Sequence, residues 1–342
     1  MSPREQPPQR KHAATSFDVA RRAGVSRAVV SRAFTPGSSI SPESRKKVLQ
    51  AASELDYRVN QMARALNRKR SDLVGLVVSD MANPYRAAQI DALAKRLVAD
   101  GYRPVLFCVD GIAETEQSIS LLLNYSVSGV VVTSGLPPEA ICYKCAERNV
   151  PLVIIDRGHH YPHADQVTSD NAGGGREAAA KFMRQGNRHL VAVEPDLVVF
   201  SVSARVEGFK RAAKSNRCEL TVIRVSDPSY ASGQKAADSF VSRSMRNAGV
   251  FCPTDLCALG FLDAMRTKHG ADIPQDLSVI GYDDIPQSSW EFANLTTFRQ
   301  PVGEVAATTL ELLESRFADP EMEERQVVLP VRMIERGTTL QQ

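Results

Sequence analysis

Apolar residues recur at helical spacing near the start of the chain. Between Thr15 and Phe34, two short segments each place their apolar residues on one face, and Gly24 separates the two segments. Ser16 and Ser26 are the candidate N-caps. Two short helices joined by a Gly-containing turn are typical of a helix-turn-helix unit. The expected buried residues are Phe17, Val19, Ala20 and Ala23 in the first segment and Val25, Val29, Val30 and Ala33 in the second.

A third helix is predicted to start at Ser41, with Pro42 in the first turn, where proline is favoured. Its expected buried residues are Val48, Leu49, Ala52 and Leu55. The three helices would share one small core. Residues 1–14 are rich in proline, glutamine and basic residues and are expected to be a disordered tail.

Beyond about residue 72 the pattern changes to short apolar runs separated by amphipathic helices. Strands that alternate with helices predict an α/β fold with parallel sheets covered on both faces. Four runs precede about residue 165 and four follow it, which indicates two lobes with a ligand site between them, at the C-terminal ends of the strands. The candidate strands are LVGLVVS (73–79), PVLFCV (104–109), GVVVT (129–133), PLVIID (151–156), HLVAV (189–193), LTVIRV (220–225), GVFC (249–252) and LSVIGYD (277–283).

Charge is distributed unevenly between these two parts. Residues 1–70 contain fifteen Lys and Arg against five Asp and Glu, whereas the remaining residues contain 27 against 34. The formal net charge of the whole chain, +3, hides this asymmetry. A basic helical head on a mildly acidic body indicates binding to a polyanion such as DNA.

Several other classes of protein do not fit. No apolar run approaches the roughly 20 residues that span a bilayer, and the N-terminus is polar and basic, so we expect a cytoplasmic protein with no membrane partner. Cys142 and Cys145 form the one CxxC pair, inside an expected helix, so we expect reduced thiols and no metal or other cofactor. Gly173–Gly175 lack the spacing of a phosphate-binding loop. The histidines near Asp156 have no arranged nucleophile and base, so no enzyme is expected.

Four separated segments follow the pattern of one family in order. They are FDVARRAGVSRAVVSRAF, SPESRKKVLQAASELDYRVNQMARAL, VIGYDDIPQSS and LPVRMIERGTTL. On these segments the chain resembles the LacI/GalR family of transcription regulators from about Thr15 to Leu340. The resemblance implies a three-helix helix-turn-helix headpiece (15–59), a hinge helix and linker (60–70) and a two-lobed core (71–342) like that of periplasmic sugar-binding proteins.

The family's core implies three crossovers between the lobes, near residues 168–170, 298–301 and 325–328. Lobe one would then span about 71–168 and 301–325, and lobe two about 169–298 and 326–342. The implied function is that of a repressor of carbohydrate-utilisation genes, which binds operator DNA as a homodimer and is controlled by a small sugar or sugar-acid effector. Two alternatives stay open: a periplasmic-type sugar-binding protein without a DNA role, and a corepressor-dependent regulator of another metabolite.

The second helix of a helix-turn-helix unit presents its N-terminal residues to the major groove. Arg27 and Ala28 would lead here, with Ser31 and Arg32 one turn further on. An arginine can donate two hydrogen bonds to guanine, so Arg27 and Arg32 are candidates for sequence readout, and phosphate contact is the alternative. The candidate phosphate contacts are Ser16, Ser26 and Arg45.

By the same resemblance the segment from Asn60 to residue 67 is the hinge helix. Leu66 matches the leucine that the family inserts into the minor groove, and Ala63 occupies the small position that permits close packing. The alternative is a short linker that docks on the core.

The resemblance also implies an effector site between the lobes. A carboxylate accepts hydroxyl hydrogens and a guanidinium donates a fork of hydrogen bonds, so Asp283 with Arg205 suits a polyol or a sugar acid. Tyr85 or Trp290 could supply an apolar wall for a sugar face. As an alternative, Asp283 and Arg205 pair with each other. The candidate ligand-binding residues are Asn83, Tyr85, Asp156, Arg205, Asp255, Asp283, Trp290 and Gln300.

Overall fold

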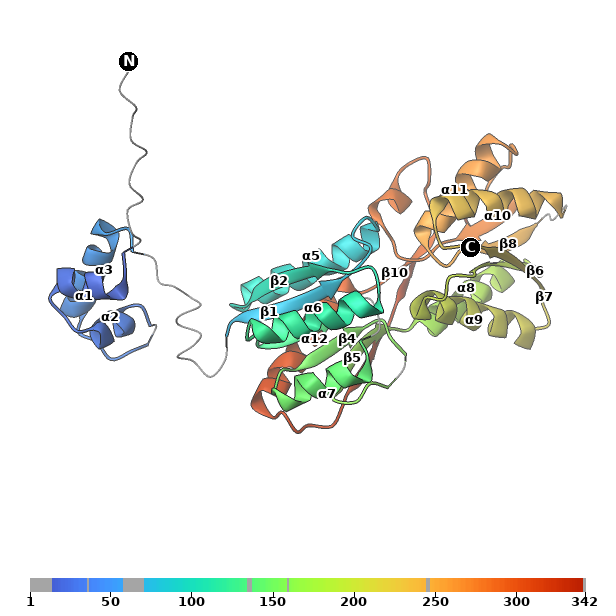
Figure 1. Cartoon of the computed structure of the whole chain (residues 1–342). Coiled ribbons are helices and arrows are strands. Elements are labelled where there is room, and N and C mark those ends of the chain that lie inside the picture. The colour runs from blue at the N-terminus through green and yellow to red at the C-terminus, as the bar shows by residue number, and fades with distance from the viewer. Residues whose placement is uncertain are drawn as a thin grey trace, which may run out of the picture. The chain divides into compact units, whose positions relative to one another are not determined.

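The computed structural model describes residues 14–35, 37–57, 71–133, 137–158, 160–243 and 247–340. The chain divides into two compact units, Met1–Ser71 and Asp72–Gln342 (Figure 1). Most of the expected disordered tail and the whole expected hinge helix lie outside the described residues. Within the described residues, no helix is both long and apolar enough to cross a membrane.

The described residues of the first unit form three helices, α1 (Ser16–Ala23), α2 (Arg27–Ala33) and α3 (Pro42–Glu54). Thr15, and not Ser16 as predicted, caps α1, because Thr15 and Asp18 form a reciprocal capping box. Gly24 follows α1 at φ 65°, a left-handed conformation that glycine adopts without steric cost. The third helix was predicted to start at Ser41, but it begins at Pro42, and the Ser41 hydroxyl caps it by accepting from the Ser44 amide at 3.1 Å.

The core of the first unit forms where the three helices meet. Val19, Val30 and Val48 are fully buried at its centre. Two residues predicted to be buried are exposed instead, Phe17 by 58% and Leu49 by 45%. The core-facing side of α1 is occupied by Val19, Ala20 and Ala23, and that of α3 by Val48 and Ala52. Phe17 and Leu49 lie beside these residues on their helices and therefore point away from the core.

Lobe one of the second unit is built on a six-stranded parallel sheet with the order β11-β5-β4-β3-β1-β2. Helices α5 and α12 pack on one face of this sheet, and α6 and α7 pack on the other. The strands are β1 (Leu73–Val78), β2 (Arg103–Cys108), β3 (Gly129–Val132), β4 (Leu152–Ile155), β5 (Ala164–Ser169) and β11 (Gln326–Leu329). The helices are α5 (Pro84–Ala99), α6 (Ile112–Asn124), α7 (Glu139–Glu147) and α12 (Val302–Ala318).

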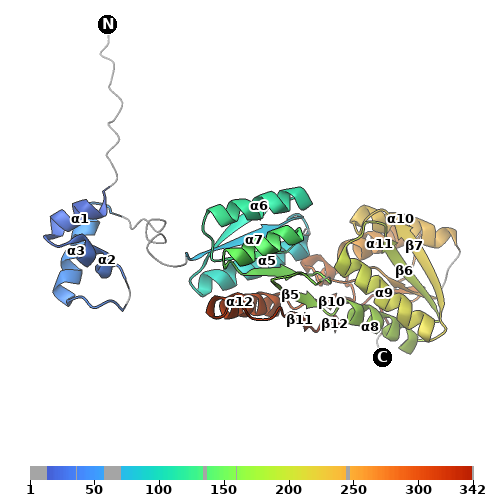
Figure 2. The same cartoon turned by 60° about the horizontal axis from the view of Figure 1, so that its bottom comes forward.

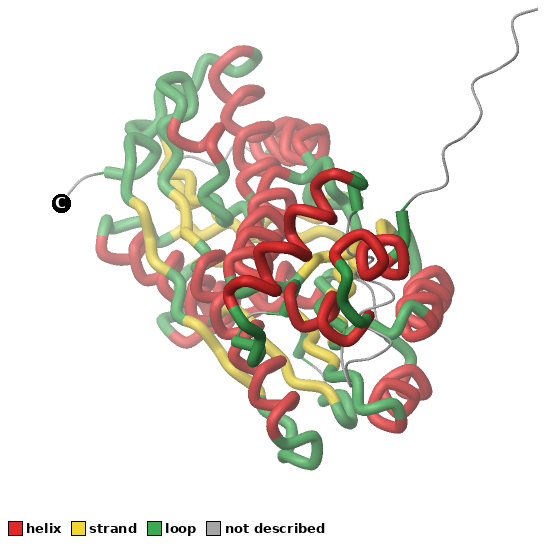
Figure 3. Tube along the Cα trace, turned by 90° about the vertical axis from the view of Figure 1, so that its left-hand side faces the viewer, coloured by secondary structure: helices red, strands yellow, loops and turns green. Residues whose placement is uncertain are grey.

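Lobe two has a four-stranded parallel sheet with the order β7-β6-β8-β9. Helices α8 and α9 cover one face and α10 and α11 the other, and strands alternate with helices along the chain. Figure 3 shows the helices of the chain in red and the strands in yellow. The strands are β6 (His189–Pro195), β7 (Glu219–Val225), β8 (Ala248–Phe251) and β9 (Leu277–Ile280). The helices are α8 (Asn171–Arg184), α9 (Phe200–Ser215), α10 (Tyr230–Ser242) and α11 (Asp255–Thr267).

Each helix pair of lobe two is in close backbone contact at glycines. A Cβ added to Gly175 of α8 would lie 2.0 Å from the Arg205 carbonyl oxygen of α9. A Cβ on Gly233 of α10 would lie 2.0 Å from the Cys257 carbonyl oxygen of α11. Both distances are far below van der Waals contact, so only glycine permits these helix crossings.

Among the described residues, three segments connect the lobes, and Figure 2 shows β10 (Thr297–Arg299) and β12 (Arg332–Ile334) in the region between them. The first connection runs from β5 into α8 and the second from β10 into α12. The predicted third crossover at 325–328 is wrong, because β11 pairs with β5 in the sheet of lobe one and the chain leaves that lobe after Leu329. β10 and β12 pair antiparallel.

The eight predicted strands are all present, with end points that shift by up to three residues. The expectation of four strands on each side of about residue 165 is wrong for lobe one, which gains β5 and β11. Cys142 and Cys145 lie buried in α7, as predicted, and burial raises the pKa of their thiols to about 11 and about 12.

Candidate functional site

Helix α2 presents a polar face that is free of core contacts. Val30 and Ala33 are buried, whereas the five predicted DNA-contacting positions on and before this helix are exposed. Ser26 occupies the N-cap position, but its hydroxyl makes no hydrogen bond to the helix. The exposed residues are Ser26, Arg27, Ala28, Ser31 and Arg32.

The arginines of the first unit are held in different ways. Arg27 lies over the ring of Phe17, with its Cζ 4.0 Å from the ring centroid. Arg32 Nε donates to its own helix at the Ala28 carbonyl, at 3.4 Å. Arg45 is half-buried and donates from Nη1 to the Ala33 carbonyl at 2.7 Å, so it joins α3 to the end of α2. Ser16 is half-buried in the first turn of α1, and Asn60, Ala63 and Leu66 lie outside the described residues.

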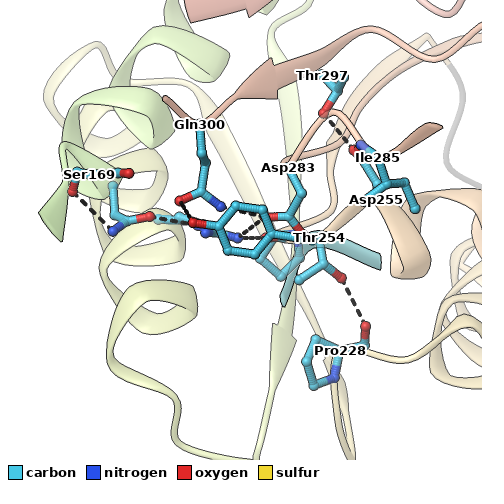
Figure 4. Close-up of polar contacts among 12 residues, drawn as sticks. Ser169, Pro228, Thr254, Asp255, Asp283, Ile285, Thr297 and Gln300 are labelled. Atoms are coloured by element: carbon cyan, nitrogen blue, oxygen red, sulfur yellow. Dashed lines mark hydrogen bonds and ion pairs between the residues drawn. The ribbon is translucent and has the colours of Figure 1, made fainter. Parts of the chain in front are cut away.

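In the second unit, buried polar side chains from both lobes form one hydrogen-bonded chain. Tyr85, in the first turn of α5, donates its hydroxyl to Gln300 Oε1 at 2.9 Å. Gln300 lies between β10 and α12, and its Nε2 donates to Asp283 Oδ1 at 2.7 Å. Figure 4 shows the side chains of Gln300 and Asp283 pointing toward one another. Because Asp283 follows β9, this chain joins the two lobes.

Arg205 extends this series of hydrogen-bonded side chains into lobe two. Its Nη1 donates to Asp283 Oδ1 at 3.0 Å and to the Pro253 carbonyl at 2.8 Å, and its Nε donates to Asn171 Oδ1 at 2.8 Å. Its guanidinium also stacks on the Tyr282 ring, with Cζ 3.8 Å from the centroid. The pairing of Asp283 with Arg205, which the sequence left open as an alternative, is therefore what the structure contains.

Asp156 ends the chain in lobe one. Its Oδ2 accepts from Gln89 Nε2 at 3.4 Å and Arg86 Nη1 at 3.5 Å, and Gln89 Nε2 also lies 3.2 Å from the Tyr85 hydroxyl. Asp156 Oδ1 is buried and has no hydrogen-bond partner among the described residues. A buried carboxylate oxygen without a donor is costly, so this atom is suited to accept a hydrogen from a bound molecule.

Both carboxylates occupy unusual backbone conformations, with φ 59° at Asp156 and 125° at Asp283. Residues other than glycine rarely adopt positive φ, and such strain is concentrated at functional sites. Burial raises the pKa of Asp283 to about 7, although the Arg205 guanidinium acts in the opposite direction. Burial also raises the pKa of Tyr85 well above its ordinary value, so its phenol stays a hydrogen-bond donor.

Three predicted ligand-binding residues have other roles. Both carboxylate oxygens of Asp255 are occupied within lobe two, by the Ser288 and Thr297 hydroxyls and the Ile285 amide. Asn83 caps α5 by accepting from the Tyr85 amide at 3.0 Å. Trp290 is half-exposed and packs against Phe292, outside the polar chain.

The structure thus brings together five of the eight predicted residues: Tyr85, Asp156, Arg205, Asp283 and Gln300. Sequence reasoning missed four others that contact them: Arg86, Gln89, Asn171 and Tyr282. Helical spacing could have identified Gln89, which lies one turn after Tyr85 on α5.

A three-helix head with an exposed basic helix, joined to a two-lobed α/β core with a buried polar chain between its lobes, defines the class of ligand-responsive DNA-binding regulators. The family model of bacterial regulatory proteins of the lacI family matches residues 17–60, and that of the periplasmic binding protein-like domain matches residues 179–339. The chain belongs to the LacI family of bacterial regulatory proteins. The predicted family and fold class are confirmed.

Relatives and solved structures agree with this assignment. The chain is 30% identical to the ribose operon repressor of Halalkalibacterium halodurans, over 95% of this chain and 97% of that protein. It is 29% identical to the HTH-type transcriptional repressor PurR of Vibrio cholerae serotype O1, over 95% and 98%. The Lac repressor dimer bound to operator and the anti-inducer ONPF is 26% identical, with a TM-score of 0.86 over 96% and 99%.

Proposed function

We propose that this protein represses carbohydrate-utilisation genes and that a small polyhydroxylated effector, a sugar or a sugar acid, controls its affinity for operator DNA. The observation that carries this proposal is the polar chain from Asp156 to Arg205, which draws side chains from both lobes. A ligand can shift a two-state equilibrium only through contacts that differ between the states. Groups that meet across the lobes are suited to provide such contacts.

The chemistry of the chain favours hydroxyl groups. Asp156 Oδ1 accepts no hydrogen bond from the described residues, so a ligand hydroxyl can donate to it. Asp283 and Gln300 can exchange their mutual hydrogen bond for hydrogen bonds to a ligand. Among the relatives is a ribose operon repressor, and a LacI family regulator of Enterococcus faecium with bound ribose is 25% identical, with a TM-score of 0.69 over 78% of this chain and 98% of that one. Both support a sugar over an apolar ligand.

On the DNA side, we propose that Arg27 and Arg32 contact base edges and that Ser16, Ser26 and Arg45 contact phosphates. A homodimer would read a pseudo-palindromic operator, and its affinity would fall steeply with salt as bound counterions are released. Leu66 would enter the minor groove at the centre of the operator, so Leu66→Ala would reduce DNA bending but leave effector affinity unchanged.

A titration of the full chain tests the effector site. An operator duplex is first selected from random DNA, and then pentoses, hexoses, sugar acids and nucleobases are titrated by calorimetry with and without that duplex. One sugar or sugar acid should bind, and it should change operator affinity by the same factor by which operator changes sugar affinity. Binding of nucleobases alone would overturn the sugar assignment.

Asp156→Asn locates the site. A hydrogen bond to a charged group contributes about 1.5–3 kcal/mol, so the variant should lose about tenfold or more in sugar affinity. Asp91→Asn, which alters an exposed carboxylate paired with Lys95 on α5, is the matched control and should bind as the parent does. Parental affinity in Asp156→Asn would show that the ligand binds elsewhere.

A further inference from the structure

Phe17 is an aromatic residue that the core of the first unit does not use. It lies in the first turn of α1 and is 58% exposed, whereas Val19 and Ala20 of the same helix are buried. Its ring lies against the guanidinium of Arg27, the first residue of α2. The contact therefore joins the start of one helix to the start of the next, on the exposed side of the helix-turn-helix unit.

The geometry of this contact leaves the hydrogen-bonding edge of Arg27 available. A guanidinium is planar and its N–H donors lie in that plane, so a ring that covers one face blocks none of them. Arg22 and Arg45 differ, because at least one donor of each is engaged within the unit, by Glu54 for Arg22 and by the Ala33 carbonyl for Arg45. Arg27 is held by its face, and its edge stays exposed.

We propose that Phe17 is a positioning residue for sequence recognition: its ring holds the guanidinium of Arg27 with the donor edge turned toward guanine in the major groove. This inference rests on the proposed base contact of Arg27. A guanidinium on a flexible side chain can also swing to a phosphate, which carries no sequence information. Restricting that motion favours the base over the phosphate, so Phe17 should affect discrimination between operators more than overall affinity.

The test measures base preference with the full-length protein. Random duplexes are selected and sequenced for the parent, Arg27→Ala, Phe17→Leu and Phe17→Tyr. Arg27→Ala should abolish the preference for guanine at one position in each half-site, which identifies the base that Arg27 reads. Phe17→Leu should reduce the preference at that same position by about two- to fivefold, the range expected for an exposed cation–π contact. Phe17→Tyr keeps the ring and should keep the preference.

Two further measurements separate positioning from a general structural effect. In the Arg27→Ala background, Phe17→Leu should have no additional effect at that position, because the residue it positions is gone. Leu49→Ala removes an apolar side chain that is similarly exposed, on α3, and should leave base preference unchanged.

The outcomes distinguish this inference from the proposed base contact. If Arg27→Ala changes no single base preference, the proposed contact of Arg27 is wrong. If Arg27→Ala does change one and Phe17→Leu leaves it intact, or weakens all operators uniformly, the contact stands and the role of Phe17 is wrong. An equal effect of Phe17→Leu in both backgrounds would also overturn it.

Discussion

The core contains two buried carboxylates, Asp165 and Asp283, whose pKa values are shifted in opposite directions. The carboxylate of Asp165 accepts two hydrogen bonds from the Arg316 side chain, at 2.9 and 3.1 Å. It also accepts from the backbone amide of Arg325 at 2.8 Å and from the Arg325 side chain at 3.3 Å. Burial alone would raise the pKa of Asp165, but these hydrogen bonds and charges hold it below its ordinary value. Asp283 has one guanidinium, shared with Pro253 and Asn171, and burial raises its pKa to about 7.

The difference separates a structural ion cluster from a group that can exchange partners. Asp165 joins β5 to α12 and to the residue before β11, with both oxygens occupied. Asp283 lies where the lobes meet, and its charge is only partly compensated. A ligand that offers hydroxyl donors can therefore replace partners of Asp283 more readily than partners of Asp165.

The largest expected loss of stability follows the substitution of Asp165. Asp165→Asn removes the ion-pair partner of the buried Arg316, and breaking such a pair costs about 3–5 kcal/mol of unfolding free energy. Urea denaturation followed by circular dichroism measures it. The exposed pair of Asp91 and Lys95 is the control, and Asp91→Asn should cost only about 0.3–0.5 kcal/mol. Equal losses in the two variants would contradict the distinction between them.

A smaller effect is expected when the polar chain is cut at Tyr85. Tyr85→Phe removes the donor to Gln300 Oε1 and leaves a buried acceptor unpaired, which costs about 1–2 kcal/mol. Tyr102→Phe removes an exposed hydroxyl that lies 3.4 Å from Glu314 and should change stability by only a few tenths of a kcal/mol. If the two phenylalanine variants were equally stable, the hydrogen bond of Tyr85 would carry no weight.

Near pH 7 the smallest effect is expected from Asp283→Asn, and the effect changes with pH. The pKa of Asp283 is raised from the ordinary value of 3.8 to about 7, so its contribution to stability is complete below pH 3.8 and is lost as pH rises through about 7. The charged groups around it are Arg205, Asp255 and Arg86. Asparagine does not titrate, so the variant should gain relative to the parent as pH rises.

Denaturation of parent and Asp283→Asn at pH 5, 6, 7 and 8 checks this sign. Near pH 7 the two should differ by less than about 1 kcal/mol, because a carboxyl with a pKa of about 7 is already about half protonated there and the neutral amide resembles that form. A constant difference across the series would contradict a raised pKa for Asp283.

The strands that the sequence predicts are those rich in apolar residues. β5 escapes this pattern because it carries Asp165 and Gln166, which are buried yet polar. Asp165 is tolerated there because Arg316 and Arg325 reach it from residues about 150 positions later. β10 and β12 have three residues each, too few for any periodicity to be read.

The sequence predicted site residues at the ends of strands, where the family's motifs could be aligned. It could not predict which side chains these residues contact, because those contacts depend on the tertiary structure. Asp255 and Asp283 both follow strands, and only the structure shows that Asp255 turns toward Ser288 and Thr297 while Asp283 meets Arg205. Asn171 and Tyr282 contact Arg205 from distant parts of the sequence of lobe two, so no local spacing in the sequence could predict these contacts.

The glycine crossings of lobe two affect how a mutational scan of this protein would be interpreted. Gly175 and Gly208 fix α8 against α9, and Gly233 and Gly260 fix α10 against α11, each with a neighbouring carbonyl in the space of a Cβ. Every one should tolerate alanine poorly although none is assigned to DNA or effector. A repressor-function screen would score these positions as severely as Arg205, so intolerance to substitution would outline the rigid scaffold of lobe two together with its binding site.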